Sequence, residues 1–278
     1  MLWVAYESQF ISDGTIRGYL AGIKDWSLKE GFSDPLKPGL LLKKVLRTLA
    51  KGRSKRLPKR SVTVNVLRLL RKSFNMRLHD HRCVYAMMAT AVALLLRIGE
   101  AVTKSENATF VIRRMDWRSW TTHATLFLKT SKCDVNSRGS LLRCPISPDK
   151  ATCAMTAVQR YINESEVYIP STGPLFVLKS GKPLTRRTVV LALQRAASRV
   201  GLAGSEFNGI SFRKGGALSL ALAGVEDRII QVLGRWSSDC YRRYLTLTDQ
   251  EIDRAIVKAA STRGQPAVEW AQPNPQHA

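Results

Sequence analysis

The fold of this chain is decided by residues 210–245, ISFRKGGALSLALAGVEDRIIQVLGRWSSDCYRRYL. The stretch places Arg213 at the start of an apolar helix rich in small residues, and Tyr244 follows thirty-one residues later. Between them, Gly234 and Arg235 end a second, shorter helix. Burying an arginine is unfavourable unless an anion meets its charge. The stretch therefore predicts a partly buried cationic site with a tyrosine near it.

A second arginine lies far upstream, where the apolar run AVALLL breaks into Arg97-Ile98-Gly99-Glu100. Glu100 follows Arg97 by one helical turn, so its carboxylate can orient the guanidinium. A guanidinium fork holds two phosphate oxygens at once. Taken alone, an ion pair that closes a helix end is the simpler interpretation. Together with Arg213 and Tyr244, the set contains the groups needed to hold a phosphodiester and attack it.

The composition indicates a polyanionic partner. The chain has 44 Lys and Arg against 21 Asp and Glu, a net charge of +23, and binding to a polyanion gains from counterion release. Hydrophobic residues make up 45% of the chain in long stretches, which favours a folded enzyme over a basic ribosomal-type or membrane-surface protein. The 278 residues allow a full domain plus a smaller one.

We expect no signal peptide, since no basic segment followed by an apolar run resembles one. Residues 85–96, the longest apolar stretch, fall short of the about 20 residues that cross a bilayer. The cysteines are odd in number and scattered, which predicts reduced thiols in an intracellular protein rather than disulfides or a zinc site. We expect the His79-Asp80-His81 cluster to be a solvated loop rather than a metal site. The cysteines are Cys83, Cys133, Cys144, Cys153 and Cys240.

The pattern of the chain predicts a mainly α-helical fold with a small antiparallel β-sheet, in the α+β class. The expected divisions are a small helical domain at 1–50, a basic linker at 51–60, a second domain at 61–261 and a disordered tail at 262–278. Helices are expected at 1–11, 14–28, 40–50, 62–74, 81–96, 151–162, 185–200, 211–224, 226–233 and 249–260. Strands are expected at 109–113, 124–128 and 140–144.

The linker, KGRSKRLPKR, carries six cationic side chains in ten residues. It is either a flexible connector or a strap that crosses DNA phosphates between two domains, and the net charge favours the strap. The DNA-binding candidates are Lys51, Arg53, Lys55, Arg56, Lys59 and Arg60.

Two further side chains are candidates for the chemistry. Lys132 lies at the bend between two predicted strands, where its ammonium could protonate a departing 5′-oxygen as general acid; Lys129 is the rival. Tyr244 is the candidate nucleophile, with Tyr241 three residues earlier on the same helix face. A phenol of ordinary pKa, about 10, is mostly neutral at pH 7, so a tyrosine nucleophile needs help from nearby arginines or a base.

The order Arg97, Lys132, Arg213, Gly234-Arg235-Trp236 and Tyr244 resembles the tyrosine recombinase (phage integrase) family. The motifs SFRKGGA and LGRWSSDCYRRYL are most similar to the eukaryotic branch carried by Crypton- and DIRS-type mobile elements. The resemblance covers nearly the whole second domain. Residues 1–50 more weakly resemble the end of the family's helical, SAM-like core-binding domain. The resemblance implies a C-shaped clamp, with the small domain on one face of the duplex and the catalytic domain on the other.

The resemblance also implies a mechanism without metal or ATP, so no cofactor is expected. Arg97 and Arg213 would neutralise the non-bridging oxygens of the scissile phosphate, and Lys132 would protonate the leaving 5′-hydroxyl. Tyr244, the tenth residue after Gly234, would form a 3′-phosphotyrosyl bond. The family's His/Trp position falls on Arg235, with Trp236 beside it, and the sequence leaves open which of the two contacts the phosphate.

One departure from the family bears on activity. The family has a histidine three residues before its second arginine, and this chain has Ile210 there. Such a group typically contributes about 10²–10⁴-fold in rate. Three hypotheses follow: a DNA recombinase or integrase of a mobile element, a weakened or inactive DNA-binding relic, and a type IB topoisomerase. A covalent adduct at Tyr244 would support the recombinase, and cleavage that is recovered by Ile210→His would support the relic. Plasmid relaxation without strand exchange would support the topoisomerase.

The resemblance further implies double-stranded DNA as partner, a homo-tetramer assembled on two DNA sites, and no membrane association. We expect a monomer in solution. Residues 249–260 carry an apolar stripe of Ile252, Ala255, Ile256 and Ala259, which either docks on a neighbouring subunit or packs on its own domain. Action on chromosomal DNA implies the nucleus if the host is eukaryotic, and residues 51–60 could double as an import signal.

Overall fold

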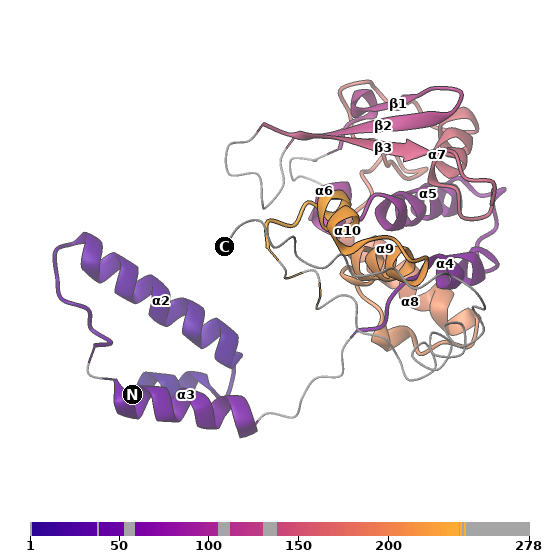
Figure 1. The fold of residues 1–278 in the computed structure, drawn as a ribbon. Helices are drawn as coiled ribbons and strands as arrows, with labels where there is room; N and C mark the ends of the chain where they lie inside the picture. The colour runs from indigo at the N-terminus through magenta and orange to yellow at the C-terminus, as the bar shows by residue number, and fades with distance from the viewer. Residues whose placement is uncertain are drawn as a thin grey trace, which may run out of the picture. The chain divides into compact units, whose positions relative to one another are not determined.

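The computed structural model describes residues 2–37, 39–52, 59–104, 112–129 and 138–238, together with Cys240 and Arg242. The chain divides into two compact units, Met1–Leu57 and Pro58–Ala278 (Figure 1). Each unit has a hydrophobic core of its own. The described residues are mainly helical, with one three-stranded antiparallel sheet, which confirms the predicted fold class.

The first unit contains the helices α1 (Leu2–Glu7), α2 (Asp13–Lys29) and α3 (Leu40–Gly52). Ser12 caps α2, and its hydroxyl accepts a hydrogen bond of 3.0 Å from the Thr15 amide. The predicted first helix was too long, because after α1 the backbone forms tighter turn bonds, such as Phe10 N–H to the Glu7 carbonyl at 3.0 Å. The core of this unit consists of Val4, Ile16, Leu20 and Leu46.

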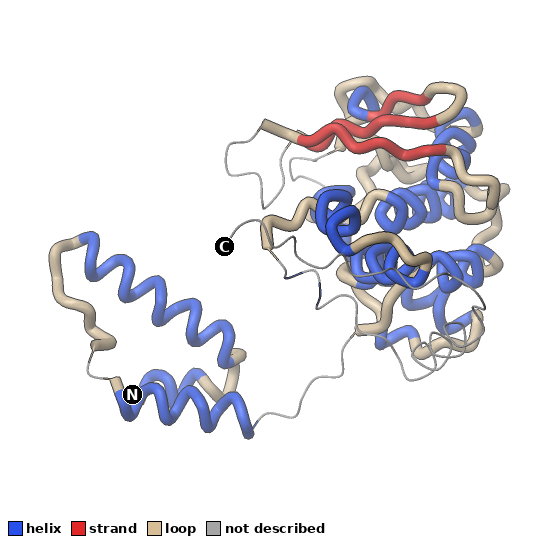
Figure 2. Tube along the Cα trace, in the orientation of Figure 1, coloured by secondary structure: helices blue, strands red, loops and turns tan. Residues whose placement is uncertain are grey.

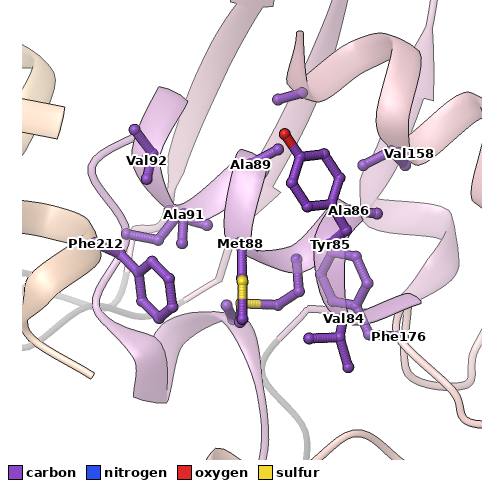
Figure 3. Packing of buried hydrophobic residues seen from close by; sticks show 14 of the residues in the cluster. Val84, Tyr85, Ala86, Met88, Ala89, Ala91, Val92, Val158, Phe176 and Phe212 are labelled. Atoms are coloured by element: carbon purple, nitrogen blue, oxygen red, sulfur yellow. The ribbon is translucent and has the colours of Figure 1, made fainter. Parts of the chain in front are cut away.

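The second unit is built around α5 (His79–Ala93), which is buried along nearly its whole length. This burial agrees with the apolar pattern of residues 81–96, although the helix begins two residues earlier and ends three earlier than predicted. Figure 3 shows Tyr85 of α5 beside Val158, and Phe212 reaching toward Ala91. The other helices are α4 (Val64–Arg71), α6 (Ile98–Ala101), α7 (Ala154–Asn163), α8 (Arg186–Arg199), α9 (Ser211–Leu222) and α10 (Asp227–Gly234).

The sheet has the order β1-β2-β3, from β1 (Trp117–Ser119), β2 (His123–Leu128) and β3 (Ser140–Pro145). Its strands run along one side of the helices of this unit (Figure 2). Alternate residues of β2, namely Ala124, Leu126 and Leu128, are buried, as the period of two in a half-buried strand requires. The predicted strands at 124–128 and 140–144 are therefore confirmed.

The predicted strand at 109–113 is wrong at its described end. Ile112 and Arg113 belong to no strand, and Arg113 makes only an isolated bridge with Pro174. The carboxylate of Asp116 accepts a 2.8 Å hydrogen bond from the Arg113 amide, which turns the chain into a short 3₁₀ helix at Arg114–Asp116. The first strand starts only after this turn, at Trp117.

The prediction of a solvated loop at His79-Asp80-His81 is also wrong. His79 starts α5 and is 2% exposed. Its Nε2 donates to the Val177 carbonyl at 2.9 Å, and its Nδ1 accepts from the Glu166 amide at 3.2 Å. The ring thus connects α5 with two later loops.

Two absences hold for the described part of the chain. No group of three or more His, Cys, Asp or Glu side chains in it could hold a metal ion. Within the same residues, no helix has both the length and the apolar character that spanning a membrane requires. The described cysteines are free, and burial raises the pKa of the Cys144 thiol to about 11.

Candidate active site

The centre of the candidate site is the buried carboxylate of Glu100, which faces three guanidinium groups. Its Oε1 lies 2.8 Å from Arg97 Nη1, and its Oε2 lies 3.0 Å from Arg235 Nη2 and 3.7 Å from Arg213 Nη1. Three positive charges against one negative charge leave the cluster with a net charge of +2. A low-dielectric environment strengthens the attraction of such a cluster for an anion. We call these four residues the arginine–glutamate cluster.

The end of α5 sets the position of Arg97. Leu95 adopts a left-handed backbone with φ of 48°, which turns the chain out of α5 and into α6. Arg97 caps α6, and Glu100 Oε2 accepts the Arg97 amide at 2.8 Å. Backbone and side chain of Arg97 are therefore held by one carboxylate. The Arg97 side chain is still 31% exposed, the most of any member of the cluster, so it is the one best placed to meet a ligand.

Arg213 is the deepest member, with its side chain 2% exposed in the first turn of α9. Its Nη2 donates to the Gly234 carbonyl, and its Cζ lies 4.5 Å from the centroid of the Trp236 ring. Removing a guanidinium from water costs several kcal/mol. The carboxylate, the carbonyl and the aromatic face offset this cost and fix the orientation of the group.

The turn after α10 places Arg235 in the cluster and Trp236 beside it. Arg235 has a left-handed backbone, with φ of 57°, and its guanidinium donates to the carbonyls of Leu94 and Leu95, both at 3.2 Å. A Cβ on Gly234 would lie 1.7 Å from the Trp236 ring, so only glycine permits this packing. The Trp236 ring is 6% exposed.

The structure shows what the two candidates for the family's His/Trp position contact within the protein. Arg235 bonds to the protein itself, through two carbonyls and Glu100. Trp236 supports Arg213 with its ring. The sequence predicted neither contact, because Arg235 and Glu100 are 135 residues apart and no local pattern joins them.

Ile210 stands one turn before Arg213 and is 45% exposed. Its amide donates to Asn208 Oδ1 at 3.0 Å. An aliphatic side chain can neither bind a phosphate oxygen nor transfer a proton. The position that the family fills with histidine therefore contributes only apolar surface here.

The described end of the linker lies against the second unit. Lys59 Nζ donates to the Ser205 carbonyl at 2.8 Å, and Arg60 is paired with Glu206 at 3.5 Å. Both side chains lie at the surface. Further along, the Val62 amide donates to the Ser211 carbonyl at 2.8 Å, and a Cβ on Gly215 would lie 2.0 Å from the Val62 carbonyl oxygen. This segment is thus fixed against α9.

Several predicted site residues lie outside the described residues. They are Lys132, Tyr241, Tyr244, Arg53, Lys55 and Arg56, together with the side chain of Lys51 and residues 249–260 and 262–278. Lys129, the rival of Lys132, is described and exposed just after β2.

Comparison with known proteins identifies a matching family and solved structures of similar fold. The profile of the Phage integrase family matches residues 63–251. The Tn1549 transposon integrase, solved with circular intermediate DNA, aligns with a TM-score of 0.59 and 13% identity over 92% of this chain and 82% of that chain. The XerA recombinase aligns with a TM-score of 0.55 and 13% identity over 92% and 85% of the two chains.

The XerH site-specific recombinase, bound to palindromic difH substrate in a post-cleavage complex, aligns with a TM-score of 0.54 and 15% identity. The alignment covers 75% of this chain but only 55% of that one, so the chain spans about half the length of this relative. A search of curated proteins finds no match. At these identities the structural likeness concerns the fold.

Proposed function

The chain belongs to the phage integrase family of tyrosine recombinases, and we propose that it breaks and rejoins double-stranded DNA through a 3′-phosphotyrosyl intermediate. The observation that carries the proposal is the arginine–glutamate cluster, in which three guanidiniums share one carboxylate. A site with this charge and donor geometry suits a phosphodiester, whose negative charge increases as the phosphorus is attacked.

In this proposal the partly exposed Arg97 and the buried Arg213 bind the two non-bridging oxygens of the scissile phosphate. Glu100 holds both guanidiniums in place, and Arg235 fixes Glu100 and the turn at the end of α5. Because Trp236 and Glu100 already orient Arg213, little reorganisation is needed when the transition state forms.

The chemical step uses residues that the family motif identifies. The Tyr244 oxygen attacks the phosphorus and gives its proton to solvent, the bond from phosphorus to the 5′-oxygen breaks, and Lys132 protonates that oxygen. The phosphotyrosyl bond conserves the energy of the broken linkage, so a 5′-hydroxyl of another strand can reverse the step. No cofactor is part of this mechanism.

Covalent trapping tests the proposal. The protein would be incubated with labelled nicked duplexes of random sequence, and adducts resolved under denaturing conditions. Tyr244→Phe should abolish the adduct, whereas the matched Tyr241→Phe should retain it. Absence of an adduct, both for the natural chain and for Ile210→His on DNA that the protein demonstrably binds, would reject the nucleophile assignment.

A second candidate function is a DNA-binding relic of a mobile element that no longer cleaves. The exposed Ile210 at the histidine position favours it, because proton transfer and phosphate binding are both missing there. Cleavage that appears only in Ile210→His would support the relic. Plasmid relaxation without strand exchange would instead favour a type IB topoisomerase.

The biological setting is part of the same proposal. The motif wording supports descent from the Crypton- and DIRS-type mobile elements of eukaryotes, and hence action in the nucleus. Double-stranded DNA is the proposed partner, with a monomer in solution and a homo-tetramer on two DNA sites. Size-exclusion chromatography with and without a bound duplex tests the change in assembly.

A further inference from the structure

A cationic pocket lies beside the first half of α5, separate from the arginine–glutamate cluster. Its volume is about 320 Å³, and it opens between the end of α4, the first half of α5 and the start of α7. The lining residues are Arg71, Met76, Arg82, Tyr85, Lys150, Ala151, Thr156, Ala157 and Arg160. Four of them are cationic and none is acidic. We call this cavity the α5 pocket.

The charge of the α5 pocket is only partly neutralised. Arg160 and Arg82 share Glu164, at 2.9 and 3.6 Å, and Arg82 also pairs with Glu166 at 3.4 Å. Within the described residues, no carboxylate lies within 4.0 Å of the cationic groups of Arg71 or Lys150. Desolvation, together with the nearby Arg160, lowers the pKa of Arg71 from its usual value. An anion in the pocket would relieve this repulsion.

The walls of the pocket hold its cations in place. The Arg71 Cζ lies 5.4 Å from the centroid of the Tyr85 ring, whose hydroxyl bonds to the Ala151 carbonyl before α7. Figure 3 shows Tyr85, which belongs to α5, facing Val158 of α7. Arg82 is 6% exposed and donates to three carbonyls, while its buried Nε has no hydrogen-bond partner among the described residues.

The geometry points to a nucleoside monophosphate as the ligand of the α5 pocket, either free or as the 5′-terminal nucleotide of a DNA strand. The cavity is larger than a phosphate ion needs and is at the lower end of the range for small-molecule sites, about 300–1,000 Å³. Arg71, Lys150 and Arg160 bind the phosphate. Met76, Ala151 and Ala157 provide an apolar wall for the base.

The pocket is distinct from the site of strand cleavage. Tyr85 lies eight residues before the end of α5, about 12 Å along the helix axis, and Arg97 lies beyond that end. The two sites share no residue. Binding in the α5 pocket therefore does not depend on the proposed recombinase chemistry.

Photo-crosslinking with 8-azido-AMP locates the binding. Peptides that contain residues 71–85 and 150–160 should be labelled, and AMP should compete better than adenosine or inorganic phosphate. Arg71→Ala and, separately, Lys150→Ala should each weaken binding about tenfold, the usual effect of one charge-assisted hydrogen bond. Lys72→Ala, which removes the same charge from an exposed residue next to the pocket, is the matched control. Thermal melting checks that each variant is folded.

The source of the nucleotide is tested with duplexes that carry or lack a 5′-phosphate on an overhanging strand. Stronger competition for pocket labelling by the phosphorylated overhang than by the unphosphorylated one assigns the pocket to DNA ends. Equal competition by the two duplexes, with AMP the better competitor, assigns it to free nucleotide. Labelling confined to peptides of the arginine–glutamate cluster would overturn the inference. Equal weakening by Lys72→Ala and Arg71→Ala would also overturn it, since that result indicates diffuse attraction only.

Discussion

The guanidinium of Arg213 lies over the ring of Trp236, 4.5 Å from its centroid. The ring can occupy this place because Gly234, two residues before it, has no side chain. The orientation of the buried arginine thus depends on a glycine and an indole that take no part in proton transfer. The geometry of the site therefore depends on these two uncharged residues as well as on its charged groups.

Replacing Gly234 by alanine should displace the indole from beneath Arg213. The new Cβ would lie 1.7 Å from the ring, so the turn must shift, and overpacking of this kind usually lowers the free energy of unfolding by about 1–3 kcal/mol. Tryptophan fluorescence and urea unfolding measure the two effects. Gly99→Ala is the control, because its Cβ meets nothing within 4 Å. Equal stability of the two variants would contradict the packing described.

Replacing Glu100 by glutamine should leave three guanidiniums without their shared negative charge. Breaking a buried ion pair in this way costs about 3–5 kcal/mol of stability. Sulfate should restore part of the loss, because an anion can replace the carboxylate. The matched control is Glu206→Gln, which removes an exposed pair worth at most about 1 kcal/mol. A sulfate response no larger than that of the control would argue against an anion site.

Two substitutions of Arg235 separate its hydrogen bonds from its backbone. Arg235→Ala and Arg235→Gly both remove the donors to Leu94, Leu95 and Glu100 and should destabilise the protein. Glycine alone is free of strain at φ of 57°, so the glycine variant should be more stable than the alanine variant by about 1–2 kcal/mol. Chemical denaturation gives the difference, and an alanine variant as stable as the glycine variant would be inconsistent with a left-handed turn.

Acid should destabilise the second unit in part through Asp149. Hydrogen bonds from Thr152 and Arg68 lower the pKa of this carboxyl below its ordinary value. Its contribution to stability is therefore complete above the unfolded pKa of about 3.9 and is lost as the pH falls through the lower folded pKa. Urea unfolding of Asp149→Asn should show a flatter dependence on pH below 4 than the natural chain. If the stabilities of the variant and the natural chain depended equally on pH, Asp149 would make no such contribution.

The sequence predicted the features of this molecule that depend on neighbouring residues. The apolar pattern of residues 81–96 identified the central helix, alternation identified β2 and β3, and a spacing of three identified the pair of Arg97 and Glu100. Each of these signals arises within a few residues, where periodicity and side-chain reach are fixed by the backbone.

Contacts between distant segments could not be predicted in this way. No local pattern indicates that Arg235 bonds to Glu100, or that His79 is buried between Val177 and Glu166. The polar sequence His79-Asp80-His81 resembles an exposed loop, but the tertiary structure buries His79. The misplaced first strand has a local cause, since the side chain of Asp116 bonds to the backbone and reverses the chain before pairing begins.

The contact between Val62 and Gly215 has a mechanical consequence. The chain that leads from the first unit passes so close to α9 that a methyl group would not fit between them, and it is hydrogen-bonded there to Ser211. Tension applied upstream of Lys59 is therefore transmitted to the helix that carries Arg213, within two residues of that arginine. A force on Lys59 would therefore reach the first turn of α9, which holds Arg213 in the arginine–glutamate cluster.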